Sequence, residues 1–280
     1  MTEIKEAKKP ETAVAKKEST TAVKTAPRTM KDYVAIMEPE IKKALPSMIK
    51  PERFTRMIYS TLSNNPELQK CTTQSFLGAM MSAAQAGVEP NTVTEEAWIL
   101  PYKDHGTLKA QFQIGARGMA RLAQRDGTVV LPPQTVYEND EFHYQLGSEP
   151  KLEHIPAMKD RGKPIGYYAV WKNAKYESEG FYFMSREDVE KHAKKYSKSY
   201  NSSFSPWTTS FDSMAEKTVV KRALKYAPIS VETAAVMASD ETIKSDISAD
   251  MSLIQDETDY MDAEVTEVVD NETGEVKDGE

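Results

Sequence analysis

The sequence predicts an α+β fold, in which a small antiparallel sheet and a β-hairpin pack with helices around a compact core. Apolar residues recur at helical spacing in several segments, and short runs rich in aromatic and β-branched residues alternate between them. Both ends of the chain lack such a pattern. We therefore expect a disordered N-terminal segment at 1–28, a core at 29–239, and an acidic C-terminal tail at 240–280.

The first part of the predicted core is helical. A capping box at Thr29 starts the first helix, and Pro39 should interrupt the segment that follows. Pro51 suits the first turn of a second helix, which has an apolar stripe. The third helix should run over residues 73–86, where small residues favour close packing, with Gly87 as its C-terminal cap.

The segment that follows indicates a β-hairpin. Trp98–Tyr102 and Leu108–Ile114 form the two strands, and Lys103–Thr107 forms the turn. The second strand alternates apolar residues with Lys109, Gln111 and Gln113, so one of its faces is polar. A helix from Ala116 to Asp126 should follow.

Two helices carry basic residues at positions i, i+4 and i+8, which places them on one ridge. A single charged helix face is usually only solvated, but two ridges with the same spacing favour a cationic binding surface. The first ridge lies on the helix after the hairpin, and the second on a helix predicted at Ser213–Ala227. Their members are Arg117, Arg121 and Arg125, and Lys217, Lys221 and Lys225, with Arg222 beside the second ridge.

The region between these helices is predicted to be mostly β, as an antiparallel meander of three to five strands. A capping box at Ser185 then opens a basic helix, and residues 196–211 form a Ser/Tyr-rich loop. In this loop Trp207 suits base stacking and core packing equally well. The short runs from which these strands are expected are 128–131, 135–137, 142–146, 152–155, 165–171 and 180–184.

The net charge of −7 conceals an uneven distribution. Residues 240–280 hold 15 acidic and 2 basic residues, so the preceding 239 residues carry a net charge of +6. A mildly basic body with an acidic tail is typical of nucleic-acid binders. Cys71 is the single cysteine, and no stretch reads as a signal peptide or membrane span, so we expect a soluble cytoplasmic protein. In the tail, apolar residues at helical spacing over 243–254 indicate a partner-binding segment.

No specific catalytic signature is present in the sequence. It lacks the phosphate-binding loop G-x-x-x-x-G-K-[ST], and its four histidines have no partners at metal-ligand spacing. Gly115 and Gly118, near the start of a predicted helix, are better explained by close packing than by phosphate binding. We therefore predict a protein that is not an enzyme and has no catalytic residue, metal or cofactor. A metal-dependent nuclease stays open as an alternative, because it would need only converging carboxylates.

Four segments together resemble the RecT family of phage and prophage single-strand annealing recombinases, over about residues 30–235. The resemblance implies that the chain binds single-stranded DNA and anneals complementary strands without ATP, as rings or helical filaments in a bacterial host cell. It also implies partnership with a 5′→3′ exonuclease, and a host single-strand binding protein is a further candidate partner. The matching segments are Ser82–Asn91, Ala97–Tyr102, Gln111–Met119 and Met214–Lys225.

Annealing requires the protein to hold the phosphate backbone and to leave the base edges free to pair. We therefore expect contacts with single-stranded and annealed DNA from basic, amide and aromatic side chains. The alternative without annealing is a protein that only protects or scaffolds single strands. We also expect the acidic tail to compete with phosphate for the DNA groove. The candidate DNA-contacting residues are Lys103, His105, Lys109, Gln111, Arg117, Arg121, Lys191, Lys194, Lys198, Trp207, Lys217, Lys221, Arg222 and Lys225.

Overall fold

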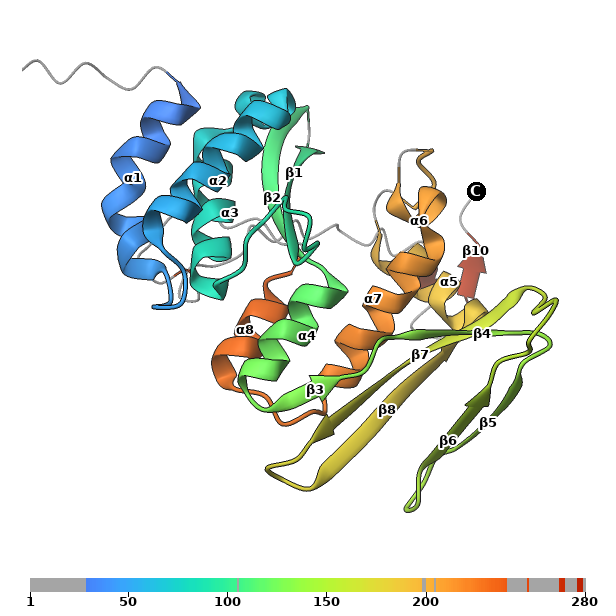
Figure 1. Cartoon of the computed structure of the whole chain (residues 1–280). Helices are drawn as coiled ribbons and strands as arrows, with labels where there is room; N and C mark the ends of the chain where they lie inside the picture. The colour runs from blue at the N-terminus through green and yellow to red at the C-terminus, as the bar shows by residue number, and fades with distance from the viewer. Residues whose placement is uncertain are drawn as a thin grey trace, which may run out of the picture.

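The computed structural model confirms the predicted α+β fold, with helices packed against small antiparallel sheets (Figure 1). It describes residues 29–104, 106–197, 200–203, 205–240, 251, 267–269 and 276–278. The predicted N-terminal segment at 1–28 lies outside these residues, and so does most of the acidic tail. No described helix has both the length and the apolar character needed to cross a bilayer.

The helical part of the core consists of α1 (Met30–Ala44), α2 (Pro51–Asn64), the short 3₁₀ helix η1 (Pro66–Lys70) and α3 (Thr73–Ala86). The predicted starts of these helices are confirmed, including the capping box at Thr29. The expected break at Pro39 is wrong, because α1 continues through it. Pro39 and the residue four before it are exposed, so water can reach the carbonyl that loses its hydrogen bond, while Ile41 is buried and anchors the next turn.

The α3 helix lies at the centre of this part. Most of its residues are buried, and it contacts α1 on one side and the following hairpin on the other. Gly87 ends it in the left-handed conformation, with φ of +63°. Cys71 is buried just before α3, and burial raises the pKa of its thiol to about 11, so the thiol is protonated at neutral pH.

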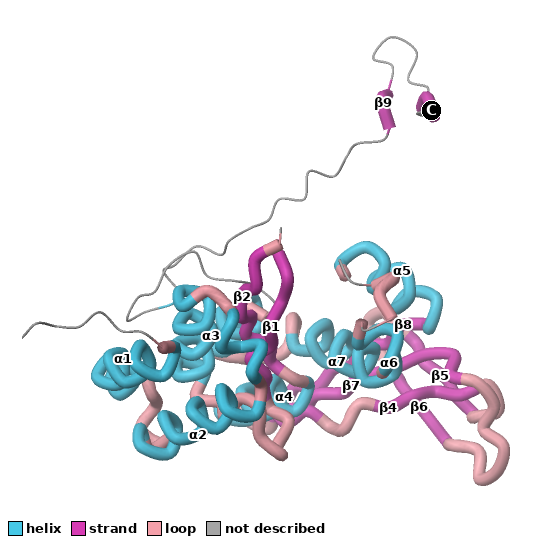
Figure 2. Tube along the Cα trace, turned by 90° about the horizontal axis from the view of Figure 1, so that it is seen from above, coloured by secondary structure: helices cyan, strands magenta, loops and turns pink. Residues whose placement is uncertain are grey.

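The hairpin consists of β1 (Ala97–Asp104) and β2 (Thr107–Ile114), which pair in antiparallel register from Ala97↔Ile114 to Asp104↔Thr107. The strands therefore extend further than the sequence predicts, and only two residues separate them. One face packs on α3 through Ile99 and Phe112, which are buried. Seen from above, the hairpin lies between α3 and α7 (Phe211–Leu224) (Figure 2).

The main sheet has β7 (Pro164–Asn173) at its centre, paired with β8 (Ser178–Ser185) on one edge. On the other edge β3 (Thr128–Val130) pairs with the end of β7, and β4 (Gln134–Tyr137) pairs with its beginning. The strands thus do not form the expected simple meander. Pro132 and Pro133 lack the amide hydrogens that would join β3 and β4 into one edge strand.

Helices cover one face of this sheet, and a second hairpin covers the other (Figure 1). Tyr167 of β7 is fully buried, and its hydroxyl donates to Asp212 of α7. The second hairpin, β5 (Glu141–Gln145) with β6 (Lys151–Ile155), packs its Phe142 ring against Tyr168 and Phe183. Alternation along β7 therefore assigns neighbouring tyrosines to opposite layers.

The second hairpin is anchored by Asp140, whose carboxylate is inaccessible to solvent. It accepts hydrogen bonds from Arg161 at 2.9 and 2.5 Å and from the Ala157 amide at 2.9 Å. The His154 ring lies 3.0 Å from the same carboxylate and 3.1 Å from the Tyr168 hydroxyl. The Arg161 guanidinium and these other donors hold the pKa of Asp140 far below its usual range.

The remaining helices are α4 (Ala116–Arg125), α5 (Arg186–Tyr196), α6 (Pro206–Thr209) and α8 (Val231–Ala238). The short α6 lies within the stretch expected to be loop. Beyond α8, Asp240 and Met251 are both buried, and the Met251 amide donates to Gln85 of α3 at 3.0 Å. The acidic tail therefore meets the core at two described positions. Strands β9 (Glu267–Val269) and β10 (Val276–Asp278) pair antiparallel.

The Asp140 network makes folding stability depend on pH. Because the pKa of the folded state is depressed, the stabilisation is present above the ordinary Asp value of about 3.9 and is lost as pH falls towards the folded value. We expect Asp140→Asn to lower stability at pH 7 and to flatten the loss of stability below about pH 5. Denaturant unfolding at a series of pH values measures both effects. An unchanged acid slope in the variant would contradict this assignment.

Candidate nucleic-acid interface

The face of the first hairpin that points away from α3 carries aromatic, amide and cationic side chains. Alternation along the paired strands places three residues of β1 on this face opposite three of β2. All six are half-buried, so each still presents part of its surface to solvent. The pairs are Trp98 with Gln113, Leu100 with Gln111, and Tyr102 with Lys109.

The candidate residues on the hairpin differ in their surroundings. Lys103 is exposed, whereas Lys109 pairs with Asp104 at 3.1 Å. The Gln113 side-chain amide donates to Gln111 at 3.0 Å, which fixes the Gln111 carbonyl. His105 lies outside the described residues.

The arginine ridge of α4 has two different roles. Arg125 donates to the carbonyls of Ala86 and Gly87, at 2.7 and 2.6 Å, and so caps the C-terminus of α3. Burial is the main cause that lowers the pKa of Arg125. Arg117 and Arg121 remain on the surface, with side chains that are 69% and 50% exposed. Arg125 also reaches the surface, but two nitrogens of its guanidinium are engaged by the Ala86 and Gly87 carbonyls.

Two acids that precede the hairpin neutralise the surface arginines. Arg117 pairs with Glu95 at 3.3 Å, and Arg121 pairs with Glu96, whose side chain is nearly buried. The spacing pattern within α4 could not reveal these partners, because they come from the chain that leads into β1. The adjacent acid pair at positions 95 and 96 is nevertheless visible in the sequence.

Two glycines allow α4 to approach this chain closely. A Cβ atom at Gly115 would lie 2.6 Å from the Trp98 ring, and one at Gly118 would collide with the Glu96 carbonyl oxygen. The packing role predicted for both glycines agrees with this contact. It positions the first turn of α4, and with it Arg117 and Arg121, beside Glu95 and Glu96.

The lysine ridge of α7 also meets an acid, from beyond α8. The Asp240 carboxylate lies 3.1 Å from Lys217 and 3.0 Å from Lys221, and it accepts a hydrogen bond from the Ile114 amide at 2.9 Å. Asp240 is fully shielded from solvent, whereas the Lys221 side chain is 40% exposed. Two lysines of one helix and the end of β2 therefore converge on one carboxylate.

The hairpin base, at Ile114 and Gly115, lies between two cationic groups. These groups are the surface arginines of α4 and the lysines of α7. Ile114 and Gly115 are consecutive, and their amides donate to different partners: Ile114 to the Asp240 carboxylate, and Gly115 to the Glu96 carbonyl at 2.8 Å. Asp240 holds the lysines of α7, and the side chain of Glu96 holds Arg121 of α4. The hairpin base thus joins residues that are about a hundred positions apart in the sequence.

The other candidate residues lie elsewhere. Lys225, at the end of α7, is exposed, and Arg222 lies 3.4 Å from the His192 ring. On α5, Lys191 pairs with Glu187 at 2.7 Å, and Lys194 lies 5.9 Å from the centre of the Tyr200 ring. Lys198 is outside the described residues.

Trp207 is buried in the core at 9% exposure. Its ring packs edge-on against Phe211, with the ring centres 5.6 Å apart. Of its two sequence interpretations, this position favours core packing, since little of the ring is accessible to a base. Trp98 and Tyr102 on the hairpin are the more accessible aromatic side chains, and Tyr226 beside Lys225 is 75% exposed.

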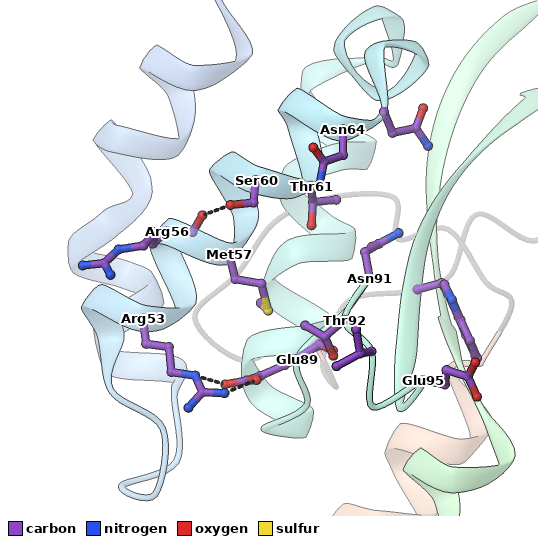
Figure 3. Close-up of a pocket in the computed structure, with 13 residues that line it drawn as sticks. Arg53, Arg56, Met57, Ser60, Thr61, Asn64, Glu89, Asn91, Thr92 and Glu95 are labelled. Carbon is purple, nitrogen blue, oxygen red and sulfur yellow. Dashed lines mark hydrogen bonds and ion pairs between the residues drawn. The ribbon is translucent and has the colours of Figure 1, made fainter.

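An open cavity of about 810 Å³ lies between α2 and the chain that leads into β1 (Figure 3). Most of the residues that line it are polar or charged, and Arg53 makes a two-point ion pair with Glu89 at one end. Glu95 and Trp98 line it near the hairpin base. A smaller cavity of about 360 Å³ lies between α4 and β3, and Arg117 and Arg121 line it. The Arg117–Glu95 pair therefore links residues of both cavities.

The sequence matches the RecT family over residues 52–260, a range that extends past Asp240. It is 32% identical over 234 residues to Protein RecT of Escherichia coli (strain K12), covering 81% of this chain and 85% of that protein. It is also 30% identical over 281 aligned positions to the uncharacterized protein YqaK of Bacillus subtilis (strain 168), covering 95% of each.

The two roles along α4 predict different effects on stability. Arg125→Ala removes two charge-assisted hydrogen bonds to the end of α3 and should cost about 1.5–3 kcal/mol. Arg117→Ala removes a largely exposed ion pair and should cost less than about 1 kcal/mol. Denaturant unfolding of both variants measures the difference. Equal losses in the two variants would contradict the assignment of Arg125 to a structural role.

Proposed function

The chain belongs to the RecT family, and we propose that it anneals complementary DNA strands without ATP, as an oligomer, in phage-type homologous recombination. The observation that carries this proposal is the arrangement at the hairpin base. Basic side chains of α4 and α7 lie on its two sides, and an aromatic and amide face rises between them. Such a surface suits a single strand, because it offers charge to phosphates and flat rings to bases.

The basic residues are suited to hold the backbone without reading the sequence. Arg117, Arg121, Lys217 and Lys221 can each neutralise a phosphate and release its counterion. On the hairpin, Trp98 and Tyr102 can stack on bases of any type. Base edges would then stay free to pair with a second strand, which is the requirement for annealing.

The acids beside these basic groups do not preclude DNA binding. The Arg117–Glu95 pair is largely exposed and contributes little to stability, so a phosphate can replace the carboxylate at small cost. Paired acids also hold the basic side chains in place before the strand arrives. We propose that Arg117 exchanges the Glu95 carboxylate for a phosphate when single-stranded DNA binds, whereas Arg121 keeps its pair with the nearly buried Glu96 and presents its exposed part to the strand.

Base pairing supplies the energy for annealing. Stacking in duplex DNA contributes about 1.4 kcal/mol per base-pair step on average. A strand segment held by one subunit is short and gives too few pairs for a lasting nucleus. Neighbouring subunits, as a ring or helical filament, would lengthen the aligned segment. A 5′→3′ exonuclease would supply the single strand, and a host single-strand binding protein is a further proposed partner.

Annealing at fixed DNA concentration tests this function. Complementary oligonucleotides carrying a fluorophore and a quencher should form duplex faster when the protein is present. As the protein is diluted, the annealing rate should fall by a larger factor than the protein concentration. ATP should not change it. A matched reaction with non-complementary strands gives the background.

Three outcomes would contradict the proposal. Acceleration that depends on ATP would exclude the energy source proposed here. Single strands that are bound and protected without faster pairing would indicate a protector or scaffold. Loss of the oligonucleotides on addition of Mg²⁺ would indicate a nuclease instead.

A further inference from the structure

The Asp240 carboxylate occupies a site built from three donors on two elements. One oxygen accepts from the Ile114 amide at 2.9 Å and from Lys217 at 3.3 Å. The other oxygen lies 3.1 Å from Lys217 and 3.0 Å from Lys221. A backbone amide and two ammonium groups thus surround one anion at the base of the hairpin.

This donor set is also suited to a phosphate group. Phosphate oxygens are commonly bound by backbone amides and by the charged ends of lysines. Donors of this kind contact the backbone of a strand and do not read its bases. The partly exposed Lys221 marks the side from which a larger anion can approach, since Lys217 is only 12% exposed.

We propose that this site binds a phosphodiester of the single strand, and that Asp240 fills it until the strand arrives. The inference rests on the function proposed above and names one phosphate site within it. The charge distribution suggests that the acidic tail competes with DNA, and this site is where we propose that they compete. Asp240 is the first residue of the acidic stretch, whose net charge is −13.

The position of Asp240 in the chain allows this exchange. The last core helix, α8, ends at Ala238 with Ser239 as its cap, so Asp240 can leave without unfolding any helix. Departure of the carboxylate alone is costly, because Lys217 is almost buried and would lose its ion pair with Asp240. A phosphate that arrives as Asp240 leaves removes this penalty. The bound strand would then repel the acidic stretch that follows.

Removal of the Asp240 charge should therefore strengthen DNA binding. Asp240→Asn keeps an oxygen for the Ile114 amide but weakens the hold on the lysines. We expect its affinity for single-stranded oligonucleotides to rise roughly fivefold or more at constant salt. Glu232→Gln is the matched control, because it removes one negative charge from the exposed first turn of α8. Its affinity should stay near that of the wild type.

A second variant keeps the proposal testable if Asp240→Asn does not fold. Lys221→Gln leaves Lys217 and the Ile114 amide to hold Asp240. If Lys221 reaches a phosphate in the complex, the log–log salt dependence of single-strand affinity should become shallower by about 0.7. An unchanged slope would mean that Lys221 contacts no phosphate and would contradict the proposed site.

Hydrogen exchange on the unmodified protein gives a third readout. Single-stranded DNA should speed exchange in the segment around residues 236–240 and slow it in α7. A wild-type protein that binds no single strands would overturn the proposed function itself. A wild type that binds and anneals, with no gain in Asp240→Asn, no slope change in Lys221→Gln and no faster exchange, would overturn only this inference.

Discussion

The close contact between the first turn of α4 and the chain that enters the hairpin determines the arrangement of the candidate interface. Gly115 and Gly118 have no side chains, so α4 can pack directly on the Glu96 carbonyl and the Trp98 ring. This contact fixes the direction in which α4 leaves β2. It thereby places the surface arginines on one side of the hairpin base and leaves the Ile114 amide on the other side, facing Asp240.

In the free protein, both cationic groups are held by the chain's own carboxylates. In the proposed function, these internal pairs limit the entropy lost when DNA binds, because the basic side chains are already ordered. In the proposed function, DNA binding exchanges one anion for another, so the net binding free energy depends on the phosphate density of the strand. The two sites differ most in solvent exposure, because the Arg117–Glu95 pair is largely exposed whereas the Asp240 carboxylate is buried. We propose that the tail influences DNA binding at the buried site.

The sequence predicts individual helices and strands better than it predicts which residues of different helices and strands contact each other. Helix starts such as Thr29 and Ser185 follow from local capping, and the hairpin follows from alternation, so these were predictable. The resemblance to the RecT family was also visible in the sequence, and the comparisons confirm it. The order of the strands around β7 was not predictable, because it depends on long-range pairing. The same holds for Arg125, which lies on the predicted ridge but caps a helix distant in sequence.

We propose that a single strand contacts basic residues on both sides of the hairpin base. The most direct measurement is the salt dependence of single-strand affinity for Arg117→Gln, Lys221→Gln and the double variant. Each single change should make the log–log slope shallower by about 0.7, and the double variant by about 1.4. A double variant whose slope matches that of either single variant, or of the wild type, would show that the strand does not contact both sides and would contradict the account.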